Sequence, residues 1–562
     1  MKPKSTSFEV QVLKDQRWVL SQVVLDENEA IQFADNLLSK SSYTAVRVVR
    51  DFARQDGLHS ETVLVEKTKT LDKKEVSTAT VSDAPICTEL ADAYGLSSRM
   101  TIGRVFRAYL DEALITPTEL LHHAREMKRL GDKGTLLMNA VDQISALQAP
   151  GGGEESKARR DFLHRSWDQL YDRARKAASE KVAKALTFAE IMARAGKTSE
   201  DKLYQARVLM AEQLLEQRGW AGKLDKVLRW AAEEGAEAHL PLLDGIVADL
   251  LIPAETIQDL LGFQPNLSSA LIRMCNLAEG KAESADQASE TFATLNRLLA
   301  AGKLPETQEV LFNRVYRELK SVNPLSRNEP SQEFEAFLRV LNRLITTGGM
   351  TGGPLMAEAL THRFVRNQSV GGQAGLQNAI DDLAADLGRC RGIVYLMSVV
   401  QAPRIAEKFK DHILRKLGYY VDDAGVDEWV PAKLSPPERM SALTACHRAI
   451  SLDKNLPEKL RTDLANAADT VLVAYLEHSG VIEKIDKPED PLAFRALRLV
   501  KFCGSGVLIK GKSLALAQKR VLGHLRQPNF EEKFLSSIPD KGQAEKHLRE
   551  FHKLLVESGF KF

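Results

Sequence analysis

The chain has 562 residues, of which 44% are hydrophobic, 27% are charged and 6% are aromatic. This composition excludes an intrinsically disordered chain and an integral membrane protein, and the length corresponds to roughly three to five domains. Lys and Arg total 77, whereas Asp and Glu total 76. This balance excludes a surface that is basic throughout, but it is compatible with a local basic patch.

Residues 8–67 show the alternation of β-strands. Strands are predicted near 8–12, 18–24, 45–50 and 62–66, and a helix from Asp26 to about Leu38 has Glu27 and Glu29 in its first turn. The order is ββαββ. A sheet of this size with one helix leaves one face to be covered by the rest of the chain or by a partner.

From Pro85 onward the apolar residues recur almost entirely at helical spacing. We therefore predict a mainly α protein in which a small N-terminal α/β domain is followed by a multi-helix body and a C-terminal helical domain. Composition divides the chain into a small α/β domain (1–70), a linker (71–83), a helical segment (84–147), a flexible linker (148–157), a helical domain (158–420), an acidic linker containing prolines (421–437) and a C-terminal helical domain (438–562).

The cysteines and the apolar runs bear on the compartment. The cysteines are odd in number, widely spaced and never form a Cys-x-x-Cys pair; they are Cys87, Cys275, Cys390, Cys446 and Cys503. This pattern is typical of a reducing compartment. Residues 1–17 lack an apolar run of signal-peptide length, and no window reaches the roughly 18 apolar residues of a membrane span. We expect a cytoplasmic protein without a transmembrane segment.

The strongest charge asymmetry is the stretch from Pro491 to Phe530, which has eight Lys and Arg residues and no Asp or Glu. A positive patch binds nucleic acid, anionic lipid or an acidic protein surface. Few aromatic residues accompany it, which argues against base stacking. The alternative is pairing with acidic helices of this chain, such as 233–259. The candidate anion-binding residues are Arg495, Arg498, Lys501, Lys512, Lys519, Arg520 and Arg526, with Lys510 in the same stretch.

The segment Gly506–Ser513 matches the G-x-x-x-x-G-K-[ST] pattern of phosphate-binding loops. That loop needs a buried strand before it, but residues 491–501 have helical spacing. The interior of the loop is bulky, and too few residues follow for the remaining strands of a parallel sheet. We therefore predict a junction between two helices and not a nucleotide site.

Four weaker patterns each have a structural explanation that we favour. Residues 157–184 form a basic helix whose apolar stripe suits a protein core better than a membrane. The glycine-rich segment 347–354 precedes a helix carrying His362, Arg363 and Arg366, and we expect a loop between helices and not an anion site. The Glu119-x-x-His122 spacing lacks the second copy that a di-iron bundle needs. Adjacent Cys446 and His447 point to different faces of a helix.

The sequence therefore predicts no catalytic residue, no cofactor and no metal ligand. We expect a non-enzymatic interaction or regulatory protein, a scaffold or adaptor that binds a protein partner through helical surfaces. Two alternatives stay open. One is a binder of nucleic acid or anionic lipid through 491–530, which salt-sensitive binding would reveal. The other is an enzyme whose site is assembled from dispersed residues, which a deep polar pocket would reveal.

Overall fold

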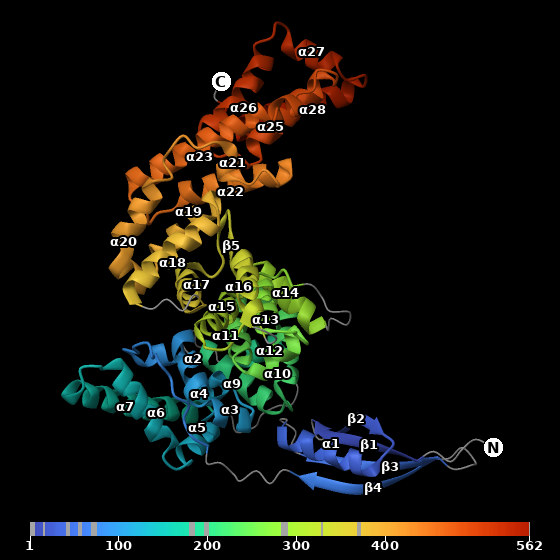
Figure 1. Ribbon diagram of the computed structural model, residues 1–562, viewed down its shortest axis with the longest axis vertical. Coiled ribbons are helices and arrows are strands. Elements are labelled where there is room, and N and C mark those ends of the chain that lie inside the picture. The colour runs from blue at the N-terminus through green and yellow to red at the C-terminus, as the bar shows by residue number, and fades with distance from the viewer. Residues whose placement is uncertain are drawn as a thin grey trace. The chain divides into compact units, whose positions relative to one another are not determined.

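The computed structural model describes residues 6–14, 17–40, 45–53, 59–68, 76–178, 186–195, 202–282, 290–326, 330–367 and 372–560. The chain divides into two compact units, Met1–Ser77 and Thr78–Phe562 (Figure 1). The described part contains 28 α-helices and one four-stranded sheet. This confirms the predicted mainly α fold with a small N-terminal α/β domain.

Unit 1 is an antiparallel sheet with a helix on one face. Its elements are β1 (Thr6–Lys14), β2 (Arg17–Val24), α1 (Glu27–Lys40), β3 (Ala45–Ala53) and β4 (His59–Thr68), and the strand order is β2-β1-β3-β4. Phe8, Val10 and Val12 alternate along β1 and are buried in the same core as Ala30 and Ala34 of α1. Period-two alternation in the strand thus meets the small residues of the helix.

A bulge changes which side chains β2 presents to each face. Val10 is paired with Gln22, but the next residue, Gln11, is paired with Leu20. One extra residue in β2 moves the side chains beyond it to the opposite face. Leu20 and Val23 consequently lie on the face away from α1, where they are half exposed.

Unit 2 is mainly helical, and its first helical element, η1, begins at Leu90. Its first half comprises η1 (Leu90–Tyr94), α2 (Leu96–Val105), α3 (Arg107–Ala113), α4 (Pro117–His122), α5 (Ala124–Gly131), α6 (Leu136–Gln148), α7 (Gly153–Ala177), α8 (Phe188–Arg194), α9 (Lys202–Leu215), α10 (Trp220–Ala232), η2 (Ala236–His239), α11 (Leu240–Leu250), α12 (Ala254–Leu261), α13 (Leu267–Ala278), α14 (Glu290–Ala300), α15 (Pro305–Lys320) and α16 (Pro330–Leu344).

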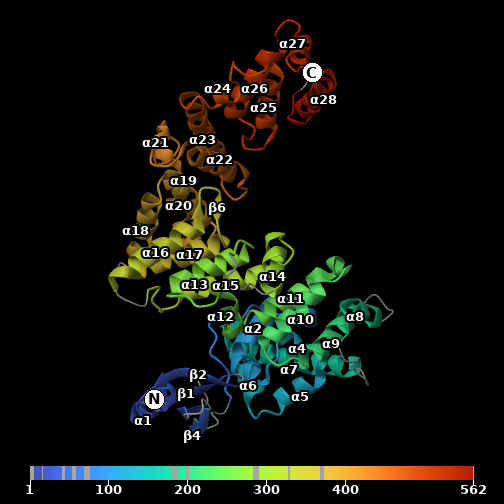
Figure 2. The same cartoon turned by 90° about the vertical axis from the view of Figure 1, so that its right-hand side faces the viewer.

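The second half of unit 2 opens with a two-stranded hairpin and is otherwise helical (Figure 2). It comprises β5 (Ile345–Thr346), β6 (Gly349–Met350), α17 (Gly353–Asn367), α18 (Gly372–Asp386), α19 (Arg389–Val399), α20 (Pro403–Gly418), α21 (Val426–Trp429), α22 (Pro436–Leu452), α23 (Glu458–His478), α24 (Val481–Ile485), α25 (Leu492–Gly504), α26 (Lys512–Leu525), α27 (Phe530–Ser536) and α28 (Lys541–Glu557). Each helix found in the described residues is too short or too polar to cross a bilayer.

Helices that follow one another in the chain pack side by side, as α6 does with α7 and α22 with α23. One hydrophobic core extends from Leu186 to Leu555. Of the predicted linker at 148–157, residues 149–152 form the turn between α6 and α7, whereas 153–157 belong to the first turns of α7. Gly152 and Gly153 adopt positive φ at this junction. The predicted linker at 421–437 contains α21. Of the predicted linker at 71–83, residues 71–75 lie outside the described residues.

Buried aspartates of α11 hold the first turns of two other helices. Asp249 accepts hydrogen bonds from Thr118 N at 2.8 Å and Thr118 Oγ1 at 2.6 Å, at the start of α4. Asp244 accepts from Glu306 N at 2.7 Å and Thr307 N at 2.9 Å, at the start of α15. The first N–H groups of a helix lack partners within the helix. Asp249 therefore adds to the local Thr116 cap of α4, and Asp244 serves α15, whose N-cap residue Leu304 forms no side-chain cap.

Candidate functional site

The basic segment 491–530 forms α25, the loop after it, α26 and the start of α27. Arg495 Nε lies 2.8 Å and Arg520 Nε 2.5 Å from the carboxylate of Asp486, whose side chain is 0% exposed. His524 Nε2 lies 2.8 Å from the same carboxylate. Burial alone would raise the pKa of Asp486, but its bonds to Arg495, Arg520 and His524 lower it below the usual value. Two of the candidate cations are therefore held by one internal carboxylate.

Two further cations of the segment are paired at its edges. Arg498 binds Asp490, and Lys501 Nζ lies 2.7 Å from Glu550 Oε1 of α28. The acidic partners thus come from the residues just before α25 and from α28, and not from 233–259 as the sequence suggested. In the described part of the chain, Lys510, Lys519 and Arg526 are exposed and form no ion pair.

Replacing Lys510, Lys519 and Arg526 together by Gln is expected to leave the free energy of unfolding within about 0.5 kcal/mol of the wild type, because exposed cations without partners contribute little. Arg495→Gln is expected to lower it by about 1.5–3 kcal/mol, since it removes a charged hydrogen bond to a buried carboxylate. Urea denaturation checks both values. If the two variants lost the same free energy of unfolding, the distinction between Arg495 as a structural cation and the other three as free cations would be wrong.

The segment that resembles a phosphate-binding loop joins α25 to α26, so a helix and not a strand precedes it. The N–H groups of Lys512 and Ser513 at the start of α26 donate to the carboxylate of Asp469 in α23, and Ser513 Oγ lies 2.5 Å from Asp469 Oδ1. A Cβ on Gly511 would stand 2.5 Å from Asp469 Oδ2. The donors that would hold a phosphate therefore bind a carboxylate of this chain.

Gly511→Ala is expected to lower the free energy of unfolding by about 1–3 kcal/mol, because the added methyl group must displace the Asp469 carboxylate or the start of α26. Gly523→Ala is the matched control in the interior of the same helix. A Cβ there meets nothing within 4 Å, so this variant is expected to gain up to about 1 kcal/mol. Thermal and urea unfolding of both variants checks the prediction, and a Gly511→Ala protein as stable as Gly523→Ala would contradict it.

The Glu119-x-x-His122 pair is buried and engaged in structure. Glu119 forms an ion pair with Lys223 of α10, and their side chains are 0% and 1% exposed. Glu119 Oε2 also accepts from Thr116 N at 2.8 Å, which caps α4. Burial lowers the pKa of His122 to about 3. Across the described ranges, no cluster of three or more His, Cys, Asp or Glu residues suits a metal ion.

The remaining weak patterns are also placed within the packed body. The glycine-rich segment 347–354 contains β6 and the start of α17. Arg363 donates to Ser321 O at 2.8 Å and Arg366 to Leu319 O at 3.1 Å, so both reach the end of α15. Both members of the adjacent Cys446–His447 pair are buried. In the segment 157–184, the described residues belong to α7 and the residue after it.

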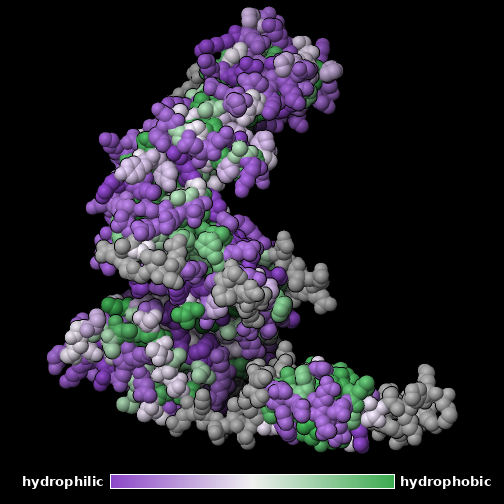
Figure 3. All heavy atoms as spheres, viewed as in Figure 1, coloured by the Kyte–Doolittle hydropathy of each residue, from purple (hydrophilic) through white to green (hydrophobic). Residues whose placement is uncertain are grey.

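A feature that the sequence analysis missed is Phe263, in the turn between α12 and α13. The residue is 89% exposed. Hydrophilic residues dominate the one face of unit 2 that Figure 3 shows. Gly262 has φ +64° and ends α12, and Pro265 follows in the turn. The sequence signal for this exposed side chain was the order Gly-Phe-Gln-Pro at 262–265. Gly and Pro mark a turn, and turns lie at the protein surface.

Phe263 stands at the edge of a hollow of ≈770 Å³ between α12, α13 and α15. Its floor includes the buried residues Ile257, Leu261, Leu271 and Met274. Its wall carries charges of both signs, from Asp259, Arg314 and Glu318. Burial lowers the pKa of Arg314, and Glu318 opposes this effect. The surface thus combines a protruding aromatic side chain, an apolar floor and partly desolvated charge.

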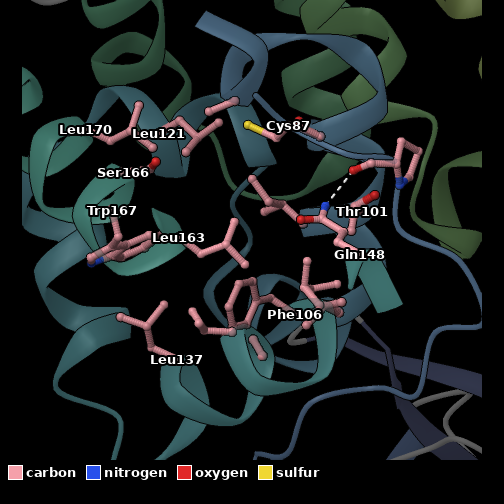
Figure 4. A pocket seen from close by; sticks show the side chains of 18 residues that line it. Cys87, Thr101, Phe106, Leu121, Leu137, Gln148, Leu163, Ser166, Trp167 and Leu170 are labelled. Atoms are coloured by element: carbon pink, nitrogen blue, oxygen red, sulfur yellow. Dashed lines mark hydrogen bonds between the residues drawn. The ribbon is translucent and has the colours of Figure 1, made fainter. Parts of the chain in front are cut away.

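A second missed feature is a smaller cavity of ≈130 Å³ formed by residues before α2 together with α2, α4, α6 and α7. Figure 4 shows Phe106, Leu121, Leu137, Leu163 and Leu170 around a common space. The apolar stripe of α7 therefore lines this cavity.

Three of the polar side chains that line the cavity are bonded within the chain. Thr101 Oγ1 donates to Ser97 O at 2.9 Å, and Ser166 Oγ donates to Phe162 O at 2.9 Å. The Gln148 side chain donates to Pro85 O at 2.6 Å, as drawn in Figure 4, and accepts from Arg159 Nε at 2.6 Å. The cavity is therefore apolar in character, and it lacks the convergent free polar groups of an active site.

Comparison with known proteins found no match of this chain to a family model, to a curated protein or to a solved structure.

Proposed function

We propose that this chain is a non-enzymatic scaffold or adaptor with a regulatory role, which binds a protein partner through its helical surface around Phe263. The observation that carries the proposal is the 89% exposure of this aromatic side chain. A Phe left in water forgoes the roughly 1.5–3 kcal/mol that its burial would contribute. Aromatic residues are enriched in the buried cores of protein interfaces.

The hollow beside Phe263 suits a protein partner better than a small substrate. Its apolar floor can take an apolar side chain, while Arg314 and the carboxylates of Asp259 and Glu318 can pair with charges on the same partner. Such a centre with a polar rim is the arrangement of specific interfaces. A cytoplasmic location is part of the proposal, and it is supported by the free thiols of all five cysteines.

The proposal is tested by placing the photocrosslinker p-benzoylphenylalanine at position 263 of the full chain in cells. The matched control carries it at position 452, where Leu452 is 68% exposed on α22. We expect one crosslinked protein that is specific to position 263 and is lost in the Arg314→Glu variant. Crosslinks no stronger or more selective than those from position 452 would reject the proposal.

Binding of nucleic acid or anionic lipid through 491–530 is a second proposal, supported by the exposed Lys510, Lys519 and Arg526. Its affinity should fall steeply as salt rises. The test compares the wild type with the variant in which these three cations are replaced by Gln, on duplex DNA, RNA and anionic vesicles at low and moderate salt. Absence of salt-dependent binding by the wild type would reject it.

A further inference from the structure

The cavity between α2, α6 and α7 has the properties of a site for hydrocarbon. A water molecule inside it would find few free partners, because Thr101, Gln148 and Ser166 of its wall are bonded within the chain. In another protein, an enclosed apolar cavity of about 150 Å³ binds benzene. The cavity here has a similar volume, ≈130 Å³, and is partly open to solvent. We propose that it binds a hydrocarbon group of about the size of a benzene ring.

The space exists because small side chains from separate elements face it. Ala93 lies in η1, Ser98 and Thr101 lie in α2, Ala140 lies in α6 and Ser166 lies in α7. Around them stand the large apolar side chains of α2, α6 and α7 and the indole of Trp167 (Figure 4). A flat or slender hydrocarbon group would contact all these walls and recover the dispersion attraction that the empty cavity lacks.

Two sources can supply such a group, namely a small apolar molecule or the end of an acyl chain. Binding of either ligand at this cavity does not involve the hollow beside Phe263, whose lining residues belong to α12, α13, α15 and the turns beside them. The inference is therefore independent of the proposed partner binding, and either can fail without the other.

The test adds benzene or decanoate to the full chain and records the melting temperature and the methyl NMR spectrum. At a free benzene concentration about one hundred times its Kd, the folding equilibrium should shift about 100-fold toward the folded state. The δ1-methyl signals of Ile102 and Ile144, which line the cavity, should move. The signal of Ile413, buried in α20, is the internal control and should not move.

Ala140→Leu is designed to fill the cavity, and Ala93→Val is a second filling variant should the first fail to fold. Either should abolish both responses to the probes. Met138→Ala is the matched control, since Met138 lies on the same helix but is 57% exposed, and it should retain both responses. Binding of benzene but not of decanoate would indicate that the cavity takes a small compact molecule. Binding of both would indicate that it takes the end of an acyl chain. No response to either probe, or a response that survives filling, would overturn the inference.

Discussion

Replacing Lys223 by Met is expected to lower the free energy of unfolding by about 3–5 kcal/mol, because it leaves the Glu119 carboxylate buried without its cation. The side chains of this pair are 0% and 1% exposed, so water cannot compensate for the lost charge. Lys223 Nζ also lies 2.5 Å from Leu114 O, which would lose this donor. Hydrogen exchange of α4 and α10, measured with urea unfolding, should show the loss at both helices.

The control for this prediction is the double variant Glu119→Gln with Lys223→Met. Gln keeps an oxygen for Thr116 N at the start of α4 but carries no charge, so the uncompensated carboxylate is absent. We expect the double variant to be more stable than Lys223→Met alone, since the cost belongs to the isolated charge more than to the lost pair. A Lys223→Met protein that unfolds like the wild type would contradict the assignment of a buried ion pair.

The second large effect is expected at Asp486. Its side chain is 0% exposed and binds Arg495, Arg520 and His524. Asp486→Ala should lower stability by about 3–5 kcal/mol, because it leaves the guanidinium groups of Arg495 and Arg520 without their anion and removes a hydrogen-bond partner of the buried His524. Hydrogen exchange should accelerate in α25 and α26, while α4 and α10 stay unchanged.

The same carboxylate makes stability depend on pH in a defined direction. The folded-state pKa of Asp486 is lowered, below an unfolded value of about 3.9. Its contribution is therefore complete above about pH 4 and is lost as the pH falls through the folded-state pKa. The protection factors of amides in α25 and α26, which are corrected for the intrinsic exchange rate at each pH, should fall below pH 4 in the wild type. If they fall by the same factor in Asp486→Asn over that range, the carboxylate is not the cause.

Short-range patterns in the sequence determined the class of most elements, although they did not predict the short hairpin of β5 and β6. Alternation at Phe8, Val10 and Val12 predicted a strand with one buried face, and helical spacing before Gly506 excluded the strand that a phosphate-binding loop requires. These inferences succeed because strand and helix periodicity is set by residues within a few positions of one another. The same local information predicted a mainly α chain with one small sheet.

The tertiary structure alone decided which charges are free. The stretch from Pro491 to Phe530 is basic in sequence, yet Arg520 meets Asp486 and Lys501 meets Glu550 across the fold. Likewise, Asp469 reaches the first turn of α26 from α23. An acid-free segment therefore does not by itself indicate an open basic surface, because ion pairs join residues that are distant in sequence.

The two candidate binding features also arose from long-range packing. Ala140 and Ser166 are ordinary helix residues in sequence, and the cavity they line exists because α2, α6 and α7 meet with small side chains facing one another. Phe263 had a local signal in its Gly-Phe-Gln-Pro turn, but only the packing of α12, α13 and α15 placed a hollow beside it. Local periodicity specifies which residues form each helix, whereas cavities and charge pairing depend on how separate helices fit together.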